Sequence, residues 1–323
     1  MYILVTGTAG FIGMHLSQKL LSLGYMVIGI DNLNEYYDIT LKRNRLGILM
    51  ENPNFHFENI DITDIDSVKK LFESFPFNKV IHLAAQAGVR YSIENPFAYL
   101  DSNVHGFLTI LEACKDYKVS HLLYASSSSV YGNNKNKLSE TEDANSPVSL
   151  YATTKRSNEL MAYTYNHLYN IRTTGMRFFT VYGPWGRPDM AYYKFTKSII
   201  EGLPIQLYNY GNLKRDFTYI DDIIKGIMLL FLHEQDINNK QPNEVYNIGN
   251  SRPYSLNYFI NTLENVIGKR ADRIELPMQL GDVVETYADI SKIRDATGYK
   301  PKIELEVGLT NFVRWYVDYH KEK

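Results

Sequence analysis

The sequence predicts an α/β protein with a Rossmann-type doubly wound parallel sheet and a smaller C-terminal substrate-binding region. Three observations support this. Short β-branched runs alternate with helical periodicities up to residue 180, a glycine-rich turn follows the first run, and shorter elements punctuated by glycine and proline follow residue 180. The chain has 323 residues, 45% of them hydrophobic, which is enough to bury a substantial core.

Six runs before residue 180 have the pattern of strands, and longer helical patterns separate them. The predicted strands are 3–5, 26–30, 55–59, 79–82, 121–125 and 173–177. The predicted helices are 14–23, 67–75, 97–117 and 151–169. This alternation is typical of a parallel sheet covered by helices on both faces.

The pattern changes after residue 180, where glycine and proline cluster at 183–188 and 202–204. Residues 245–248 predict a further strand that rejoins the sheet. We therefore expect a dinucleotide-binding Rossmann domain over 1–180, with returning segments near 218–250. Residues 181–323 are expected to form mainly the substrate-binding region.

Composition excludes several classes of protein. The 34 basic residues nearly balance 36 acidic ones, so there is no cationic surplus for nucleic acid. Cys114 is the only cysteine, which excludes an internal disulfide and a cysteine-rich zinc cluster, and no metal is expected. The first residues run directly into the glycine turn, and no stretch approaches the roughly 20 apolar residues of a membrane span. We expect a cytoplasmic protein without membrane insertion.

The glycine turn predicts a dinucleotide site. Gly7, Gly10 and Gly13 follow a strand and open a helix, where backbone N–H groups and the helix dipole favour a pyrophosphate. Their spacing departs from G-x-G-x-x-G. Asp31, at the end of the second strand, is placed to accept hydrogen bonds from both ribose hydroxyls, and it would repel a 2′-phosphate. Its two following residues carry no positive charge, so NAD is favoured over NADP.

Asp61 and Ile62 follow the third strand and are expected to contact adenine, with Asp61 accepting from the exocyclic amine. The alternative is that Asp61 only caps the following turn.

A serine-rich segment, 126–132, brings hydroxyls to the carboxyl edge of the sheet. Tyr151 and Lys155 lie four apart, on one face of the following predicted helix, so an ammonium can favour the phenolate. The Tyr-x-x-x-Lys spacing alone is not specific. It occurs at Tyr131/Lys135, Tyr151/Lys155, Tyr193/Lys197, Tyr210/Lys214 and Tyr319/Lys323. Only Tyr151 opens a helix after the serine-rich strand end.

Taken together, these motifs resemble an extended short-chain dehydrogenase/reductase of the nucleotide-sugar 4-epimerase family, and the resemblance runs essentially end to end. The strings that carry it are residues 7–13, 31–33, 82–85, 126–132, 151–155 and 215–217. Residues 36–38, 87–92 and 186–191 are similar to those of UDP-glucuronate 4-epimerases.

The resemblance implies roles for individual residues. Ser127 would bond the reacting hydroxyl, Tyr151 would be the base, and Lys155 would also hold the nicotinamide ribose. The implied NAD-binding set is Gly7, Ala9, Gly10, Phe11, Ile12, Gly13, Asp31, Asn32, Asp61, Ile62, Leu83, Ala84, Ala85, Asn103, Tyr151 and Lys155. The implied UDP-sugar-binding set is Arg90, Ser127, Ser128, Thr180, Arg187, Tyr208, Arg215 and Gln279.

Within the second set, Tyr208 is expected to stack on uracil and Arg215 to pair with the UDP phosphates. Gln279 stands where some epimerases have a phosphate-binding arginine, so the resemblance leaves the pyrophosphate contacts less defined. Arg187, with Thr180 and Ser128, suggests a sugar that carries a carboxylate. The alternative is that Arg187 pairs with Asp189 and only shapes its loop.

The expected reaction is NAD-dependent 4-epimerisation of a UDP-sugar, with UDP-glucuronate to UDP-galacturonate as the leading case. UDP-N-acetylglucosamine or an acetamido uronic acid is an alternative substrate. A non-catalytic NAD-sensing regulator is the alternative from another class, although Ser127, Tyr151 and Lys155 argue against it. The resemblance also implies a role in polysaccharide biosynthesis and a homodimer, formed through helices 97–117 and 151–169. The alternative is that these helices pack only within one chain.

Overall fold

The computed structural model describes residues 1–134, 137–234 and 241–321. The chain forms two compact units. Unit 1 comprises Met1–Gly132, Asp143–Arg177 and Ile227–Tyr246, and unit 2 comprises Asn133–Glu142, Phe178–Gly226 and Asn247–Lys323. The assignment of these parts to cofactor and substrate stays a prediction.

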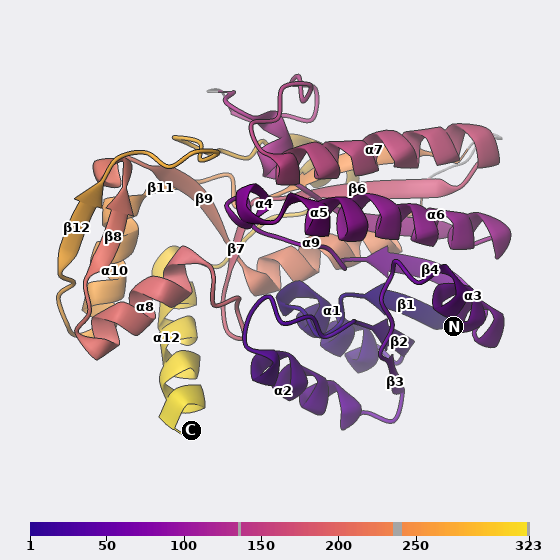
Figure 1. Ribbon diagram of the computed structural model, residues 1–323, viewed down its shortest axis with the longest axis horizontal. Helices are drawn as coiled ribbons and strands as arrows, with labels where there is room; N and C mark the ends of the chain where they lie inside the picture. The colour runs from indigo at the N-terminus through magenta and orange to yellow at the C-terminus, as the bar shows by residue number, and fades with distance from the viewer. Residues whose placement is uncertain (135–136, 235–240, 322–323) are drawn as a thin grey trace. The chain divides into compact units, whose positions relative to one another are not determined.

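A seven-stranded sheet organises unit 1, in the order β10-β6-β5-β4-β1-β2-β3 (Figure 1). Its strands are β1 (Tyr2–Thr6), β2 (Met26–Ile30), β3 (Phe55–Glu58), β4 (Phe77–His82), β5 (His121–Ser127), β6 (Arg172–Phe178) and β10 (Asn243–Ile248). The pairs β1/β2, β1/β4, β2/β3 and β4/β5 are parallel. Strand order reverses beside β1, so ligands of such a sheet bind at the carboxyl ends of β1 and β4. The predicted fold class, the six early strands and the rejoining strand are confirmed.

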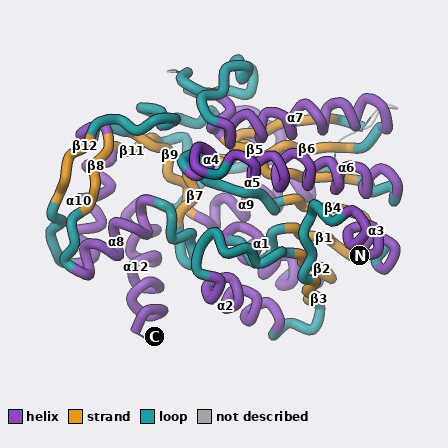
Figure 2. The backbone as a smooth tube through the Cα atoms, in the orientation of Figure 1, coloured by secondary structure: helices purple, strands orange, loops and turns teal. Residues whose placement is uncertain are grey.

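Helices follow the strands of unit 1 in turn. They are α1 (Phe11–Ser22), α2 (Ile39–Met50), α3 (Ile65–Ser74), α4 (Tyr91–Glu94), α5 (Pro96–Tyr99), the π-helix η1 (Leu100–His105), α6 (Gly106–Asp116), the 3₁₀ turn η2 (Ser128–Tyr131) and α7 (Leu150–Tyr169). Helices α6 and α7 run side by side (Figure 2). The predicted helix 97–117 is helical throughout its core, but a π segment interrupts it. Helix α2 was not predicted.

One hydrophobic core of unit 1 lies between the sheet and helices α3, α6 and α7. Leu4, Val80 and Leu122 from the strands contact it, as do Phe72 and Phe107 from the helices. Ile3 and Val5 are also fully buried but do not belong to this cluster, since alternate residues of a strand point to opposite faces. The sheet is therefore covered on both faces.

Unit 2 contains two small sheets and the remaining helices. One sheet has the order β11-β9-β7, and the other pairs β12 with β8. The strands are β7 (Thr180–Tyr182), β8 (Ile205–Tyr208), β9 (Lys214–Tyr219), β11 (Pro253–Ser255) and β12 (Arg273–Leu276). The helices are α8 (Ala191–Glu201), η3 (Asn209–Gly211), α10 (Leu256–Ile267), α11 (Ser291–Thr297) and α12 (Leu305–Lys321), while α9 (Ile220–Leu232) passes from unit 2 into unit 1.

Among the described residues, no helix is both long and apolar enough to cross a membrane.

Candidate active site

The glycine turn joins β1 to α1 with almost no room for side chains. The Gly10 N–H donates to the Gly7 carbonyl at 3.0 Å, and a Cβ atom at Gly13 would lie 2.1 Å from that same oxygen. Gly10 caps α1, so no capping side chain accepts from the first helical N–H groups, and the first turn carries no acidic residue. These donors and the helix dipole suit a pyrophosphate, so the turn fits a dinucleotide.

Asp31 lies at the carboxyl end of β2 and is nearly buried. Its Oδ2 accepts from the Ala9 N–H at 3.2 Å and its Oδ1 from the Leu33 N–H at 2.9 Å. Burial raises the pKa of this carboxyl, against the opposing charge of Lys42. An ionised carboxylate can accept about four hydrogen bonds, so both oxygens keep capacity for ribose hydroxyls.

Positive charges near Asp31 come from α2, which the sequence analysis missed. Arg45 is fully buried and donates to the Ala9 carbonyl at 3.0 Å. Lys42 is also buried, and its ammonium donates to the Asn34 carbonyl and side-chain oxygens, both at 2.8 Å. Both cations therefore brace the loops around the glycine turn.

Asp61 makes the turn contacts that the capping alternative predicts. Its Oδ1 accepts from the Thr63 N–H at 2.9 Å and from the Thr63 hydroxyl at 2.7 Å. Its Oδ2 accepts from the Asn32 amide at 2.8 Å, which ties the ends of β2 and β3 together. Ile62 is buried in the core against α6. The predicted contact of Asp61 with adenine stays a prediction.

The segment after β4 lies directly against the glycine turn. The Ala84 N–H donates to the Thr6 hydroxyl at 3.1 Å, and a Cβ at Gly7 would lie 2.7 Å from the Ala84 nitrogen. Leu83, Ala84 and Ala85 are half-buried there, as expected of residues lining a cofactor. Asn103 is buried, and its amide binds Gln86 and Thr154.

A pocket of about 380 Å³ opens beside this region of unit 1. The residues lining it are Asn32, Asn34, Glu35, Tyr36, Gln86, Tyr91, Ala98 and Ser102. The sequence analysis assigned a role only to Asn32 among them. The polar stretch directly after Asp31 could have indicated Asn34, Glu35 and Tyr36, whereas the lining residues between 86 and 102 carry no comparable local signal.

The predicted catalytic residues come together where β5 ends and α7 begins. Ser127 is the last residue of β5, and its hydroxyl accepts from the Ser129 N–H at 3.2 Å. Tyr151 is the second residue of α7, whose N-cap Ser149 accepts from the Ala152 N–H. One turn later the buried Lys155 donates to the Ala125 carbonyl at 3.0 Å, two residues before Ser127. Lys135 and Lys323, from two competing Tyr-x-x-x-Lys matches, lie outside the described residues.

Burial of Lys155 has an electrostatic consequence. Its removal from water lowers the pKa of the ammonium to about 8. Nearby, burial first and the charge of Lys155 second lower the pKa of His82 to about 3, so His82 is neutral at pH 7. Lys155 is then the cation closest in sequence to Tyr151 on this face of α7.

A second buried carboxylate fixes α7 to the sheet, and the sequence analysis missed it. Glu159 accepts from the Ser126 hydroxyl at 2.6 Å and from the Arg177 guanidinium at 2.7 Å on each of its oxygens. Burial opposes ionisation of Glu159, but Arg177, Ser126 and Arg156 together outweigh it and hold the pKa of that carboxyl below its usual value. This bidentate pair locks the strand end that carries Ser127.

The predicted substrate-binding residues are divided between the two units. Unit 1 contains Arg90, Ser127 and Ser128, and unit 2 contains Thr180, Arg187, Tyr208, Arg215 and Gln279. Thr180 begins β7 and is half-buried. Arg187 donates from Nε and Nη2 to the two Asp189 oxygens at 3.0 and 2.5 Å, and its N–H donates to the Tyr192 hydroxyl. This is the pairing that the loop-shaping alternative predicts, so the structure does not favour the carboxylate clamp over it.

Tyr208, Arg215 and Gln279 all lie in unit 2. Tyr208 pairs with Leu276 at the ends of the parallel strands β8 and β12, and the segment with Gln279 continues from there. Arg215 donates to the carbonyls of Lys214 and Val284. Within the described part of the chain, the buried Gln279 amide oxygen has no hydrogen-bond partner.

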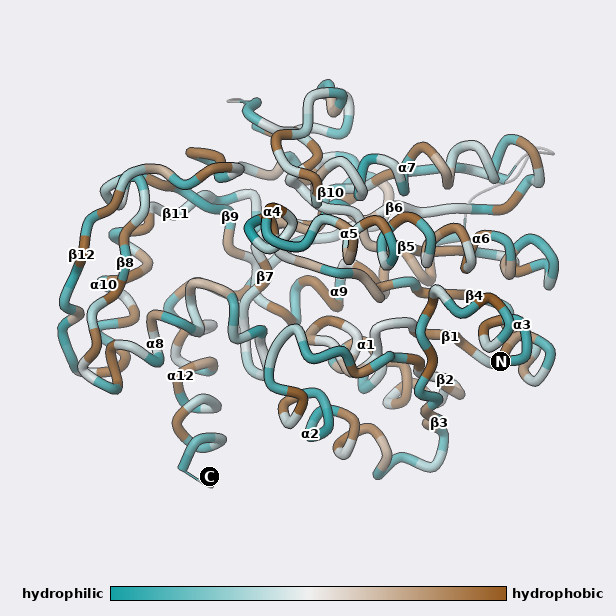
Figure 3. The backbone as a smooth tube through the Cα atoms, viewed as in Figure 1, coloured by the Kyte–Doolittle hydropathy of each residue, from teal (hydrophilic) through white to brown (hydrophobic). Residues whose placement is uncertain are grey.

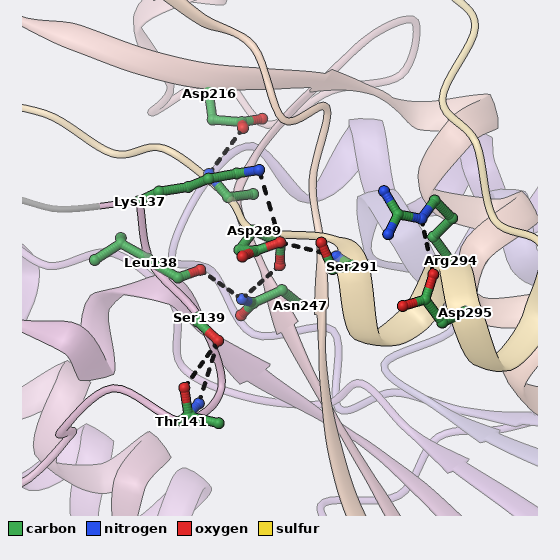
Figure 4. Close-up of polar contacts among 11 residues, drawn as sticks. Lys137, Leu138, Ser139, Thr141, Asp216, Asn247, Asp289, Ser291, Arg294 and Asp295 are labelled. Carbon is green, nitrogen blue, oxygen red and sulfur yellow. Dashed lines mark hydrogen bonds and ion pairs between the residues drawn. The ribbon is translucent and has the colours of Figure 1, made fainter.

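Asp216, beside Arg215, anchors this region (Figure 4). It is fully buried and accepts from the N–H groups of Asn250 at 2.7 Å and Ala288 at 3.1 Å. Burial raises the pKa of Asp216 to about 6. In the same figure, the Asn247 amide bridges the Leu138 and Asp289 carbonyls. The sequence analysis gave neither residue a role.

Comparison with known proteins agrees with this geometry. Residues 3–249 match the model of the NAD dependent epimerase/dehydratase family. The chain is 48% identical over 335 residues to Protein CapI of Staphylococcus aureus, with all of both chains covered. It is 47% identical over 334 residues to UDP-glucuronate 4-epimerase 2 of Arabidopsis thaliana, covering 99% of this chain and 76% of that protein.

Among solved structures, it resembles UDP-glucuronic acid 4-epimerase from Bacillus cereus in complex with UDP-glucuronic acid and NAD. The TM-score is 0.92 at 37% identity, covering 99% of this chain and 100% of that one. The chain therefore belongs to the NAD dependent epimerase/dehydratase family.

Proposed function

We propose that this protein is a nucleotide-sugar 4-epimerase that uses NAD to interconvert UDP-glucuronate and UDP-galacturonate. One observation carries the proposal: Tyr151 and the buried Lys155 share a face of α7, and Lys155 binds the strand end that carries Ser127. The related proteins from Arabidopsis thaliana and Bacillus cereus, named for UDP-glucuronate and UDP-glucuronic acid, support the choice of substrate.

The chain's own residues account for the proton chemistry. When bound, NAD would accept a hydride from C4 of the sugar and return it to the opposite face. Tyr151 accepts the proton of the 4-hydroxyl and later gives it back, while Lys155 favours the phenolate. Ser127 binds the same oxygen. Tyr208 and Arg215 hold the UDP part, so the sugar can turn between the two hydride transfers.

The test is incubation of the purified protein with UDP-glucuronate, with product recorded by NMR. We expect the 4-epimer without any external hydride acceptor, whereas a pentose product or a requirement for an acceptor would contradict the proposal. Tyr151→Phe keeps the ring and should lower turnover by about 10²–10⁴, since it removes the proton-transferring hydroxyl. Unchanged turnover in that variant would indicate an NAD-binding regulator.

UDP-N-acetylglucosamine is the second candidate substrate, because the Arg187 guanidinium already pairs with Asp189. If Arg187 recognises the sugar carboxylate, Arg187→Ala should lower kcat/KM for UDP-glucuronate by about 10-fold or more and leave UDP-N-acetylglucosamine little affected. Thr310→Ala, at a half-buried position of α12, is the control. Intact turnover of UDP-glucuronate by Arg187→Ala would remove the argument for a uronic acid.

The proposed assembly is a homodimer formed through α5, α6 and α7. Large apolar side chains on these helices are exposed, including Phe97, Leu108, Leu160, Tyr163 and Leu168. Hydrophobic positions recur along α6 and α7 (Figure 3). Exposed apolar patches of this kind are typical of protein interfaces.

We place the enzyme in the cytoplasm, which cell fractionation would test. We also propose that it supplies a precursor for polysaccharide biosynthesis, which deletion of its gene would test.

A further inference from the structure

Tyr99, the last residue of α5, contacts two functional parts of unit 1 at once. Its side chain is fully buried. Its ring meets the ring of Tyr151 edge to face, with centroids 6.1 Å apart and planes at 78°. Its hydroxyl lies 2.5 Å from the Gly88 carbonyl oxygen and 3.0 Å from that of Ala87. One side chain therefore joins the predicted base to the segment that follows β4.

The hydroxyl contact fixes the loop that leads to Arg90. A phenol has one proton, and here it is directed at two successive carbonyls of the loop. Gly88 has a φ of +103°, a conformation in which the backbone turns sharply. Just beyond it, the Arg90 carbonyl accepts from the Ile93 N–H at the start of α4. Release of the Tyr99 hydroxyl would free the backbone two residues before Arg90.

The ring contact restricts Tyr151. Tyr151 is half-buried near the start of α7, and the Tyr99 ring packs against its ring. Edge-to-face aromatic pairs prefer this geometry over a parallel stack. The π-helix η1, which follows Tyr99, also contacts the main chain of Tyr151 through Thr154. Asn103 of η1 donates to the Thr154 hydroxyl, and Thr154 donates to the Tyr151 carbonyl.

Asn103, in the π segment that follows Tyr99, also binds the segment after β4. Its amide oxygen accepts from the Gln86 N–H at 2.8 Å, and its NH₂ group donates to the Gln86 carbonyl at 3.0 Å. Asn103 thus binds Gln86, the residue directly before Ala87 and Gly88, whose carbonyls accept from Tyr99. Single π turns are often found at functional sites. The stretch from α5 to η1 is a brace between α7 and this segment.

We propose that Tyr99 is a positioning residue with two separable actions. Its ring orients the Tyr151 phenol for proton transfer, and its hydroxyl holds the loop that presents Arg90 to the substrate. The proposal rests on the proposed function, in which Tyr151 is the base and Arg90 binds the UDP-sugar.

The experiment compares Tyr99→Phe with Tyr99→Leu in the full-length protein, using UDP-glucuronate. Tyr99→Phe keeps the ring, so kcat should stay near the wild-type value while KM rises about 2- to 10-fold, as for the loss of one hydrogen bond. Tyr99→Leu removes the ring as well, so kcat should also fall about 10-fold or more. Tyr124→Phe is the control, because the buried Tyr124 hydroxyl has no partner among the described residues.

A double-mutant cycle with Arg90→Ala identifies the route of the hydroxyl effect. If the hydroxyl acts through Arg90, Tyr99→Phe should raise KM little further in the Arg90→Ala background. If the effects of Tyr99→Phe and Arg90→Ala on KM are additive, the proposal is wrong. It is also wrong if kcat falls equally in Tyr99→Phe and Tyr99→Leu, whether or not their melting temperatures differ from that of the wild-type protein. Failure of the wild-type protein to form the 4-epimer would instead refute the proposed function, so the two failures are distinguishable.

Discussion

At the scale of single residues, Lys155 shows how function conflicts with stability. A lysine that is 2% exposed, with its ammonium on one carbonyl oxygen, loses most of its hydration. Burial lowers its pKa from 10.5 to about 8, so holding its charge at pH 7 costs folding free energy. The positive charge is nevertheless what a phenol base at Tyr151 requires.

We predict that Lys155→Met raises the stability of the nucleotide-free protein at pH 7 by about 1–3 kcal/mol and lowers turnover by at least about 10²-fold. The folded pKa lies below the unfolded one, so wild-type stability rises as pH increases from about 8 to 10.5. The advantage of the variant should shrink over that range. Denaturant unfolding at pH 7 and pH 10 measures it, and a constant difference would contradict the assignment.

Arg187 illustrates what a single sequence leaves open at this scale. A guanidinium in a glycine- and proline-rich loop predicts a carboxylate partner, but both Asp189 and a uronic acid supply one. The structure gives Arg187 the Asp189 partner, with the two side chains each about one-fifth exposed. Only a measurement with substrate separates the two interpretations.

At the scale of elements, the glycine turn is fixed by contacts within the backbone itself. The Gly7 carbonyl accepts from the Gly10 N–H and lies beside Gly13, so the turn closes on one oxygen. The sequence analysis explained these glycines by the approach of a pyrophosphate. The structure adds a second reason, since a side chain at Gly13 would collide with the protein before it met a ligand.

We predict that Gly13→Ala destabilises the fold by about 1–3 kcal/mol through overpacking and lowers NAD affinity at least about 10-fold. Gly47→Ala is the control: Gly47 lies inside α2, a Cβ there would meet nothing within 4 Å, and helix propensity should give about 1 kcal/mol of added stability. Thermal unfolding and titration with NAD measure both effects. Wild-type NAD affinity in Gly13→Ala would show that the turn tolerates a shift.

The elements that were predicted and those that were missed differ for a physical reason. Strands such as β1 and β2 are almost entirely apolar runs, which a sequence pattern detects directly. Helix α2 buries Lys42 and Arg45 together with leucines, so its pattern does not separate an apolar face from a charged one. The start of α2 does have a signal in the sequence, because Asp38 is a residue type that often caps helices. In the structure its side chain accepts from the Thr40 N–H.

The same reasoning applies to the site. Residue type and position at strand ends predicted the glycine turn and Asp31. Tyr151 and Lys155 were predicted from their spacing at the start of a helix that follows the serine-rich strand end. The role of Ser127 was implied by the family resemblance. The contacts of Glu159 with Arg177 and Ser126 join residues 18 and 33 positions apart, which no local pattern encodes. The π turn that aims Asn103 is likewise invisible, because one extra residue per turn leaves a helical pattern nearly unchanged.

At the scale of the whole molecule, unit 1 exposes large apolar side chains on α5 and α7, which is the basis for the proposed dimer. On α7, Leu160, Tyr163 and Leu168 are 54%, 59% and 61% exposed. Leu160 and Tyr163 are three residues apart and therefore neighbours on one face of the helix. On α5, Phe97 is 72% exposed. A twofold axis beside α7 would bury the same residues on both copies, as an isologous interface requires.

We predict that the wild-type protein sediments as a dimer at micromolar concentration and that Leu160→Glu combined with Tyr163→Glu converts it to a monomer. Two carboxylates per copy would have to be buried unpaired in the interface, a cost of several kcal/mol. Leu203→Glu, a similar change at a residue that is 51% exposed in unit 2, should leave the dimer intact. Sedimentation velocity distinguishes these species. A wild-type protein that sediments as a monomer would contradict the dimer, and dissociation by Leu203→Glu alone would place the interface on a different surface from α5, α6 and α7.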